Sequence, residues 1–239
     1  MIQRTILSNT LMGLFFLTSC NQHNMKDENG SWAKLEKYAA ANAALPPPDT
    51  VNKRVVFMGD SITEFWEQAD SAFFTLNQYI NRGISSQVTE MMLVRFRQDV
   101  LALRPAVVVI LGGTNDIAEN NGPATPQTAF DNIVSMAELA AAKGIAVVLC
   151  SVLPAEDFYW HRHLLPVEKI KTLNKLLHQY AIDNHLQYVD YYSLLTDADN
   201  SFDKKYSNDG VHPNSAGYAV MKPLVEKAIA HTLNNGVTL

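Results

Sequence analysis

Two segments of this chain, residues 106–111 and 145–150, are almost uninterrupted runs of apolar residues. Such runs are typical of parallel β-strands, because helices cover a parallel sheet on both faces and leave the strand no polar side. Shorter strand patterns occur at residues 55–58, 78–80 and 187–189. The sequence therefore predicts five strands, of which the third and fourth are fully buried.

The segments between these strands, and the last part of the chain, carry apolar residues at helical spacing. The predicted faces consist of Val88, Met92, Phe96 and Val100; of Phe130, Ile133, Ala137 and Ala141; of Ile170, Leu173, Leu177 and Tyr180; and of Tyr218, Met221, Val225 and Ile229. Strands that alternate with helices predict an α/β fold, a three-layer α/β/α sandwich around a five-stranded parallel sheet. Sites in such sheets form at the carboxyl ends of the strands.

The N-terminus has the layout of an export signal. Arg4 precedes a short apolar run at residues 11–17, which cannot span a bilayer because a span needs about 20 apolar residues. The sequence Leu17-Thr18-Ser19-Cys20 resembles a bacterial lipobox, the signal for cleavage and lipidation at the cysteine. We expect a lipidated Cys20 to anchor the protein in the bacterial cell envelope, on the periplasmic face or the cell surface. An ordinary secretory cleavage site is the alternative.

The chain has 239 residues, 47% of them hydrophobic, which suits one domain with a substantial core. Two domains would each have only a small core. We expect a signal peptide over residues 1–19, a flexible tether over 20–30 and a single domain over 31–239. Ser31 is expected to cap a helix at the start of this domain. The net charge is −5 and the basic residues are scattered, which argues against nucleic acid as a partner.

Four short segments far apart in the chain carry polar residues suited to catalysis. They are Gly59-Asp60-Ser61, Gly83, Gly112-Gly113-Thr114-Asn115-Asp116 and Asp209-Gly210-Val211-His212. A serine hydroxyl becomes nucleophilic when a base lies within hydrogen-bond reach, and His212 can be this base. Asp209 can hold the other ring nitrogen. Taken alone, Ser61 would be read as a helix cap, and the last segment as a turn.

In this order the four segments resemble the SGNH hydrolases, the GDSL-type esterases and lipases, over about residues 55–218. The resemblance implies a flavodoxin-like SGNH hydrolase fold. It also implies a catalytic triad of Ser61, His212 and Asp209.

The resemblance further implies an oxyanion hole, in which three donors hold the negative oxygen of the transition state. These donors are the backbone amides of Ser61 and Gly83 and the side-chain amide of Asn115. Asp60 and Asp116 are expected to support their loops. Relatives often carry glycine at the position of Ser86, so this loop is expected to differ slightly from theirs.

The segment after the fourth strand is expected to wall a substrate cleft. Tyr159 or Trp160 could stack on a sugar ring there, although packing over the core is an equal alternative. His161 and His163 have a metal-like spacing without an evident carboxylate or cysteine partner, so no metal is expected. Cys150 lies in an apolar strand and is expected to be buried and inert.

The predicted activity is that of a serine esterase that acts through an acyl-enzyme and needs no cofactor. The expected substrate is a small-molecule or saccharide ester with a short acyl group, and acetyl is the expected acyl group. A lysophospholipase or thioesterase of the same superfamily is an alternative. A non-catalytic glycan-binding lipoprotein is the alternative from another class, because fold does not fix function.

Overall fold

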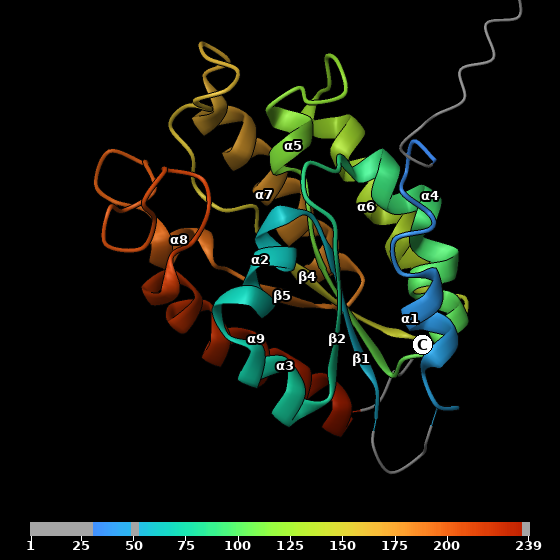
Figure 1. The fold of residues 1–239 in the computed structure, drawn as a ribbon. Coiled ribbons are helices and arrows are strands. Elements are labelled where there is room, and N and C mark those ends of the chain that lie inside the picture. The colour runs from blue at the N-terminus through green and yellow to red at the C-terminus, as the bar shows by residue number, and fades with distance from the viewer. Residues whose placement is uncertain (1–30, 49–52, 236–239) are drawn as a thin grey trace, which may run out of the picture.

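The computed structural model describes residues 31–48 and 53–235. The predicted signal peptide (1–19), the lipidation site Cys20 and the tether (20–30) lie outside these residues. A five-stranded parallel sheet forms the middle layer, in the order β2-β1-β3-β4-β5 (Figure 1). This sheet confirms the predicted α/β fold.

The strands fall where the apolar runs predicted them, within a few residues. Their bounds are β1 (Val55–Gly59), β2 (Tyr79–Gly83), β3 (Val107–Leu111), β4 (Ala146–Cys150) and β5 (Gln187–Val189). The register pairs Gly59 of β1 with Gly83 of β2 and with Leu111 of β3. These three strands therefore end at the same level, and the segments that follow them start side by side.

Successive strand residues point to opposite faces of the sheet, and each face has its own apolar core. One face is covered by α4 (Thr89–Asp99), α6 (Pro126–Ala141) and α7 (Pro166–Asp183). The other is covered by α2 (Ser61–Ala69), α3 (Ser71–Asn77) and α9 (Ser215–Asn235) (Figure 1). The result is the predicted three-layer sandwich.

Shorter helices complete the described chain. They are α1 (Ala39–Ala44), the 3-10 helix η1 (Leu101–Leu103), α5 (Thr114–Ile117) and α8 (Tyr192–Leu195). Pro223 lies inside α9 without ending it. Within residues 31–48 and 53–235, no helix has both the length and the apolar character that a membrane span requires.

Two helix predictions were inaccurate. The helix expected from Ser31 begins only at Ala39, because Lys34 adopts a φ of 52°, which breaks the helical path. Residues 32–33 and 35–38 form turns instead. In α6 the buried face includes Ala140 rather than Ala141, since packing against the sheet sets the rotation of the helix.

Cys150 lies in β4 with 2% of its surface exposed. Burial raises the pKa of its thiol to about 12, so the thiol stays protonated at neutral pH. A protonated, buried thiol is a poor nucleophile, and Cys150 acts as a core residue.

Candidate active site

Ser61 is the first residue of α2, and only Asp60 separates it from β1. The residue before it, Asp60, is the helix cap, because its Oδ1 accepts the N–H of Ile62 at 2.9 Å. Capping by Asp60 leaves the Ser61 hydroxyl free for another partner. Ser61 is 6% exposed, so the protein shields most of this residue from solvent.

The structure brings Ser61, His212 and Asp209 together from the two ends of the domain. Ser61 Oγ lies 2.9 Å from His212 Nε2, and His212 Nδ1 lies 2.7 Å from Asp209 Oδ2. An ionised carboxylate can only accept, so it holds the ring hydrogen on Nδ1. Nε2 then faces Ser61 as an acceptor. The arrangement can take a proton from the serine hydroxyl.

Hydrogen bonds keep Asp209 ionised. Burial alone would raise its pKa, but donation from the His212 amide and ring and from the Val211 amide outweighs burial and lowers the pKa. Its Oδ1 accepts these two amides at 2.8 Å and 2.9 Å. Asp209 is therefore a carboxylate at neutral pH.

Ser207 organises the same loop, and sequence reasoning missed it. Its hydroxyl oxygen accepts the N–H of Gly210 at 2.9 Å. Its hydrogen points to the carbonyl of His212, 2.8 Å away, with Asp209 Oδ1 at 3.2 Å as a second acceptor. Ser207 is 4% exposed. The available signal was its place two residues before Asp209, where serine commonly closes a turn.

Asn115 lies at the start of α5, just beyond β3, and is 4% exposed. Its Nδ2 donates to the carbonyl of Gln87 at 3.0 Å and lies 3.3 Å from Asp60 Oδ2. Burial raises the pKa of Asp60 to about 6. The two contacts of Nδ2 direct the side-chain amide of Asn115 toward the Asp60–Ser61 turn and toward the loop that follows β2.

Gly83 ends β2, and its N–H donates to Asn81 Oδ1 at 2.8 Å. This bond counts against the predicted oxyanion role, because the amide already has an acceptor. The glycine has another reason to be there: a Cβ at this position would lie 2.2 Å from the backbone nitrogen of Glu64 in α2. Gly83 lets β2 and α2 approach.

Ser86 lies three residues further along the same loop. It is exposed and adopts a φ of 68°, in the left-handed region that favours glycine. Within the described parts of the chain, its N–H has no hydrogen-bond acceptor. Ser86 thus offers a free backbone donor where Gly83 does not.

Asp116 joins the loop after β3 to the N-terminus of α4. Its carboxylate accepts both the N–H of Thr89, at 2.9 Å, and the Thr89 hydroxyl. Burial raises the pKa of Asp116, and the bonds from Thr89 act in the opposite direction. The bond network holds the Asn115 loop against α4.

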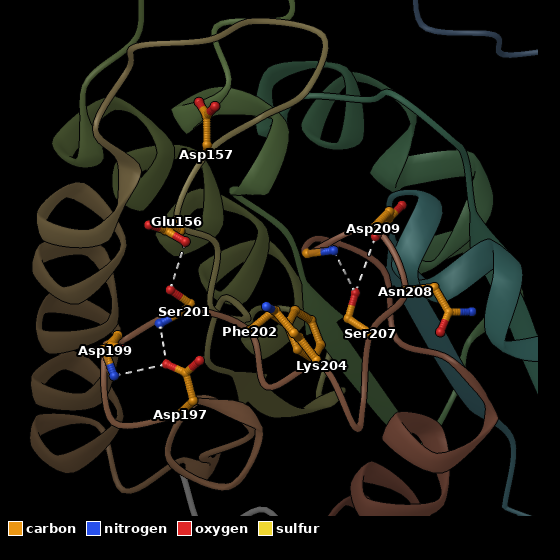
Figure 2. A pocket seen from close by; sticks show the side chains of 11 residues that line it. Glu156, Asp157, Asp197, Asp199, Ser201, Phe202, Lys204, Ser207, Asn208 and Asp209 are labelled. Atoms are coloured by element: carbon orange, nitrogen blue, oxygen red, sulfur yellow. Dashed lines mark hydrogen bonds between the residues drawn. The ribbon is translucent and has the colours of Figure 1, made fainter.

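An open cavity of about 710 Å³ borders Asp209. Figure 2 shows Asp209 and Ser207 at one side of it and Glu156 and Asp197 at the other. Its lining consists of Glu156, Asp157, Asp197, Asp199, Ser201, Phe202, Lys204, Ser207, Asn208, Asp209 and Gly210. Acidic side chains outnumber basic ones, so the cavity favours ligands that donate hydrogen bonds and carry no negative charge.

Tyr159 and Trp160 do not line this cavity. They are 57% and 39% exposed, and Trp160 Nε1 donates to Asn120 Oδ1 at 2.7 Å. His161 Nδ1 donates to the carbonyl of Ala118. No group of three or more His, Cys, Asp or Glu side chains within residues 31–48 and 53–235 has a metal-binding arrangement.

Residues 57–220 match the GDSL-like lipase/acylhydrolase family. The chain therefore belongs to this family, whose members are ester-hydrolysing enzymes. A solved GDSL-like lipase of Bacteroides thetaiotaomicron is 46% identical, with a TM-score of 0.83 over 84% of this chain and 99% of that one.

Two curated relatives match more distantly. The uncharacterized lipoprotein YqeF of Bacillus subtilis is 33% identical over 36% of this chain and 36% of its own length. The acetylxylan esterase of Xylanibacter ruminicola is 28% identical over 63% of this chain and 33% of its own length. The chain thus spans about a third of the length of each.

Proposed function

We propose that this protein is a serine esterase with Ser61 as nucleophile, His212 as general base and Asp209 as the carboxylate that orients it. The contact between Ser61 Oγ and His212 Nε2, 2.9 Å, carries this proposal. His212 takes the hydroxyl proton while Oγ attacks the ester carbonyl. It then passes the proton to the leaving alcohol. Water, activated by the same ring, releases the acid from the acyl-enzyme.

The negative oxygen formed by this attack needs donors aimed at it. The proposed donors are the N–H of Ser61 at the start of α2, Nδ2 of Asn115 and a backbone amide of the loop after β2. Ser86 suits the last role better than Gly83, whose N–H is bound to Asn81. A helix N-terminus also favours negative charge, which supports Ser61 as a donor.

The proposed substrate is a short-chain ester, such as an acetyl ester, of a neutral hydroxyl-rich alcohol such as a carbohydrate. The acetylxylan esterase among the relatives supports this choice. The cavity beside Asp209 supports it too, because carboxylates such as Glu156 and Asp197 accept hydrogen bonds from sugar hydroxyls and repel phosphate.

We further propose that the protein is exported and anchored through lipidated Cys20. The lipobox-like sequence and the lipoprotein among the relatives support this. Two or more acyl chains hold a protein firmly to a bilayer, whereas one gives only marginal binding. Replacement of Cys20 by Ala is expected to move the protein from the membrane fraction to the soluble fraction on cell fractionation.

The test is ester hydrolysis by the full chain in mild detergent, with Ser61→Ala as the control. The substrates are p-nitrophenyl esters from acetyl to long-chain acyl, together with an acetylated polysaccharide. Ser61→Ala should lower kcat by at least about 10⁴-fold, since only the oxyanion donors and binding remain, while the melting temperature stays the same. Equal activity in the variant would refute the mechanism.

The acyl series separates the possible substrates. Serine-dependent hydrolysis confined to short acyl groups supports the carbohydrate esterase. Rates that rise with acyl length point to a lysophospholipase or thioesterase. Binding of glycans without any serine-dependent hydrolysis would support the non-catalytic alternative.

A further inference from the structure

A line of three side chains leads from the surface to Asn115. Trp160 Nε1 donates to Asn120 Oδ1 at 2.7 Å, and Asn120 Nδ2 donates to Asn115 Oδ1 at 2.6 Å. Asn115 Nδ2 then donates to the carbonyl of Gln87 at 3.0 Å. Trp160 only donates, whereas Asn120 and Asn115 each accept a hydrogen bond on the side-chain oxygen and donate one from the side-chain nitrogen.

The direction of this line is fixed at both ends. An indole N–H can only donate, so the atom of Asn120 that faces Trp160 must be the oxygen. The nitrogen of Asn120 then faces Asn115, which must present its own oxygen. At the other end the Gln87 carbonyl can only accept. No second orientation of either amide keeps all three bonds.

The same line leaves Asn115 with a usable donor. One hydrogen on Nδ2 goes to Gln87, and the other has only a long contact of 3.3 Å, to Asp60 Oδ2. This second hydrogen lies toward the Asp60–Ser61 turn. Donation by Asn120 to the Asn115 oxygen also draws electron density toward that oxygen, and successive bonds of this kind strengthen one another.

We propose that Asn120 and Trp160 are positioning residues that hold the Asn115 amide with Nδ2 toward the oxyanion. This inference rests on the proposed function, in which Asn115 is an oxyanion donor. Asn120 acts directly on Asn115, and Trp160 acts through Asn120. Neither needs to touch the substrate.

The packing around Trp160 explains how an exposed side chain can serve this purpose. Its ring lies 5.2 Å from the ring of Phe158, which is fully buried. The next residue, His161, bonds to the carbonyl of Ala118 in the segment that carries Asn120. The loop after β4 is thereby joined to the segment after β3, and the indole N–H is held in place.

The chain contains a matched pair that lacks the connection to Asn115. Trp32, which is 44% exposed, points its Nε1 at Asn121 Oδ1 from 3.5 Å. Asn121 is the neighbour of Asn120 and is also exposed, but it has no bond to Asn115. Changes at Asn121 and Trp32 therefore control for charge and for loss of an indole near the site.

The first experiment compares Asn120→Asp with Asn121→Asp in hydrolysis of p-nitrophenyl acetate. The new carboxylate at position 120 can still accept from Trp160 but presents an oxygen to Asn115 Oδ1. We expect kcat to fall about tenfold with KM nearly unchanged, the effect of one misplaced hydrogen bond. Asn121→Asp should leave both parameters unchanged. Equal effects of the two changes would overturn the proposal.

The second comparison is Trp160→Phe against Trp32→Phe. Loss of the Trp160 N–H frees Asn120 to rotate. We expect kcat to fall by about threefold, which corresponds to part of the free energy of one hydrogen bond. Trp32→Phe should leave kcat unchanged. A change in KM alone in Trp160→Phe would mean that the ring contacts substrate, and would overturn its role in positioning.

A double-mutant cycle separates positioning from general damage to the structure. If Asn120 acts only through Asn115, adding Asn120→Asp to Asn115→Ala should change kcat by less than about twofold. A persistent tenfold loss in that background would overturn the proposal, since it would show that Asn120 acts by another route.

Asn115→Ala by itself separates the proposed donor role of Asn115 from the positioning role of Asn120 and Trp160. A loss of about 10²–10³ in kcat is expected for an oxyanion donor. If this variant keeps full kcat, the proposed role of Asn115 fails, and the positioning role fails with it. If Asn115→Ala loses activity while Asn120→Asp behaves like Asn121→Asp, only the positioning role fails.

Discussion

The serine side and the histidine side of the candidate site are built differently. Ser61, Asn115 and Asp116 lie within five residues of the ends of central strands of the sheet, and each is at most 6% exposed. The side chains of Asp209 and His212 are 35% and 20% exposed, on a segment between α8 and α9 that contains only turns and isolated bridges.

The hydrogen bonds that hold the two sides differ in the sequence separation of the residues that they join. Asn115 bonds to a residue 28 positions away, and Asp116 to one 27 away. Every bond among Ser207, Asp209, Gly210 and His212 joins residues at most five apart. The serine side thus depends on the packed core, whereas the histidine side depends on its own loop. Loss of the buried groups that support the serine side should therefore cost stability, whereas changes to the histidine loop should cost activity with little loss of stability.

The largest effect is expected on the histidine side. Asp209→Asn places an amide against the ring of His212 and disfavours the tautomer that can accept from Ser61. We expect kcat to fall by about 10⁴-fold, with a change of less than about 1 kcal/mol in the free energy of unfolding at pH 7. Activity assays and urea unfolding measure the two. A variant that unfolds would contradict the proposed independence of the loop from the core.

A substitution at Arg95 tests whether the serine side depends on the packed core. It is fully buried in α4, pairs with Asp99 at 3.1 Å, and donates to the carbonyl of Gly59. Arg95→Met leaves Asp99 buried without its partner, and we expect a loss of about 3–5 kcal/mol in the free energy of unfolding. Lys171→Met, which breaks an exposed pair with Glu168, should cost less than about 0.5 kcal/mol. Similar losses would mean that the buried pair contributes no more than a surface one.

The two sides should also respond to pH in opposite directions. Burial raises the pKa of Asp60 to about 6 from an ordinary 3.8, so the folded state holds this proton more tightly than the unfolded chain does. Its contribution to stability should fall by roughly 2–3 kcal/mol as the pH rises from about 4 to about 6. The pKa of Asp209 is lowered, so its contribution is lost as the pH falls.

Urea unfolding of the wild type and of Asp60→Asn, from pH 4 to pH 7, measures the first of these effects. The variant should lack the part of the fall that comes from Asp60, because an amide does not titrate, whereas Asp116, whose pKa burial also raises, titrates in both proteins. Identical pH dependence in the two proteins would contradict the assignment of the shifted pKa to Asp60.

Of the changes that compare the two sides of the site, Ser207→Ala is expected to have the smallest effect. Ser207→Ala removes the hydroxyl that joins the carbonyl of His212 to the N–H of Gly210. We expect kcat to fall about tenfold and the melting temperature to change little, since one local bond is lost and the core is untouched. Ser135→Ala, which removes a hydroxyl that donates to the carbonyl of Asp131 in α6 and does not line the cavity, is the matched control. If Ser207→Ala lowered the melting temperature strongly and kcat only slightly, Ser207 would depend on the packed core, as the serine side does.

The sequence predicted the sheet well because its central strands β1, β3 and β4 are apolar runs, and burial on both faces leaves little alternative. It predicted the N-terminal helix poorly, since the turn at Lys34 depends on a backbone angle that no pattern indicates. The four polar segments were each ambiguous alone. Their order along an alternating pattern of strands and helices predicted that they form one site, because the ends of neighbouring parallel strands meet at one edge of the sheet.

The sequence by itself determined the fold class, the family and the set of polar residues brought to one edge of the sheet. Only the tertiary structure decided which donors are free there: the Gly83 amide is bound to Asn81, while the line from Trp160 through Asn120 orients Asn115. The direction of an N–H depends on local torsion angles and on partners far away in the sequence, such as Asn120, 40 residues from Trp160. Apolar burial follows from residue type and spacing, whereas a hydrogen bond requires two atoms to meet at a defined distance and angle.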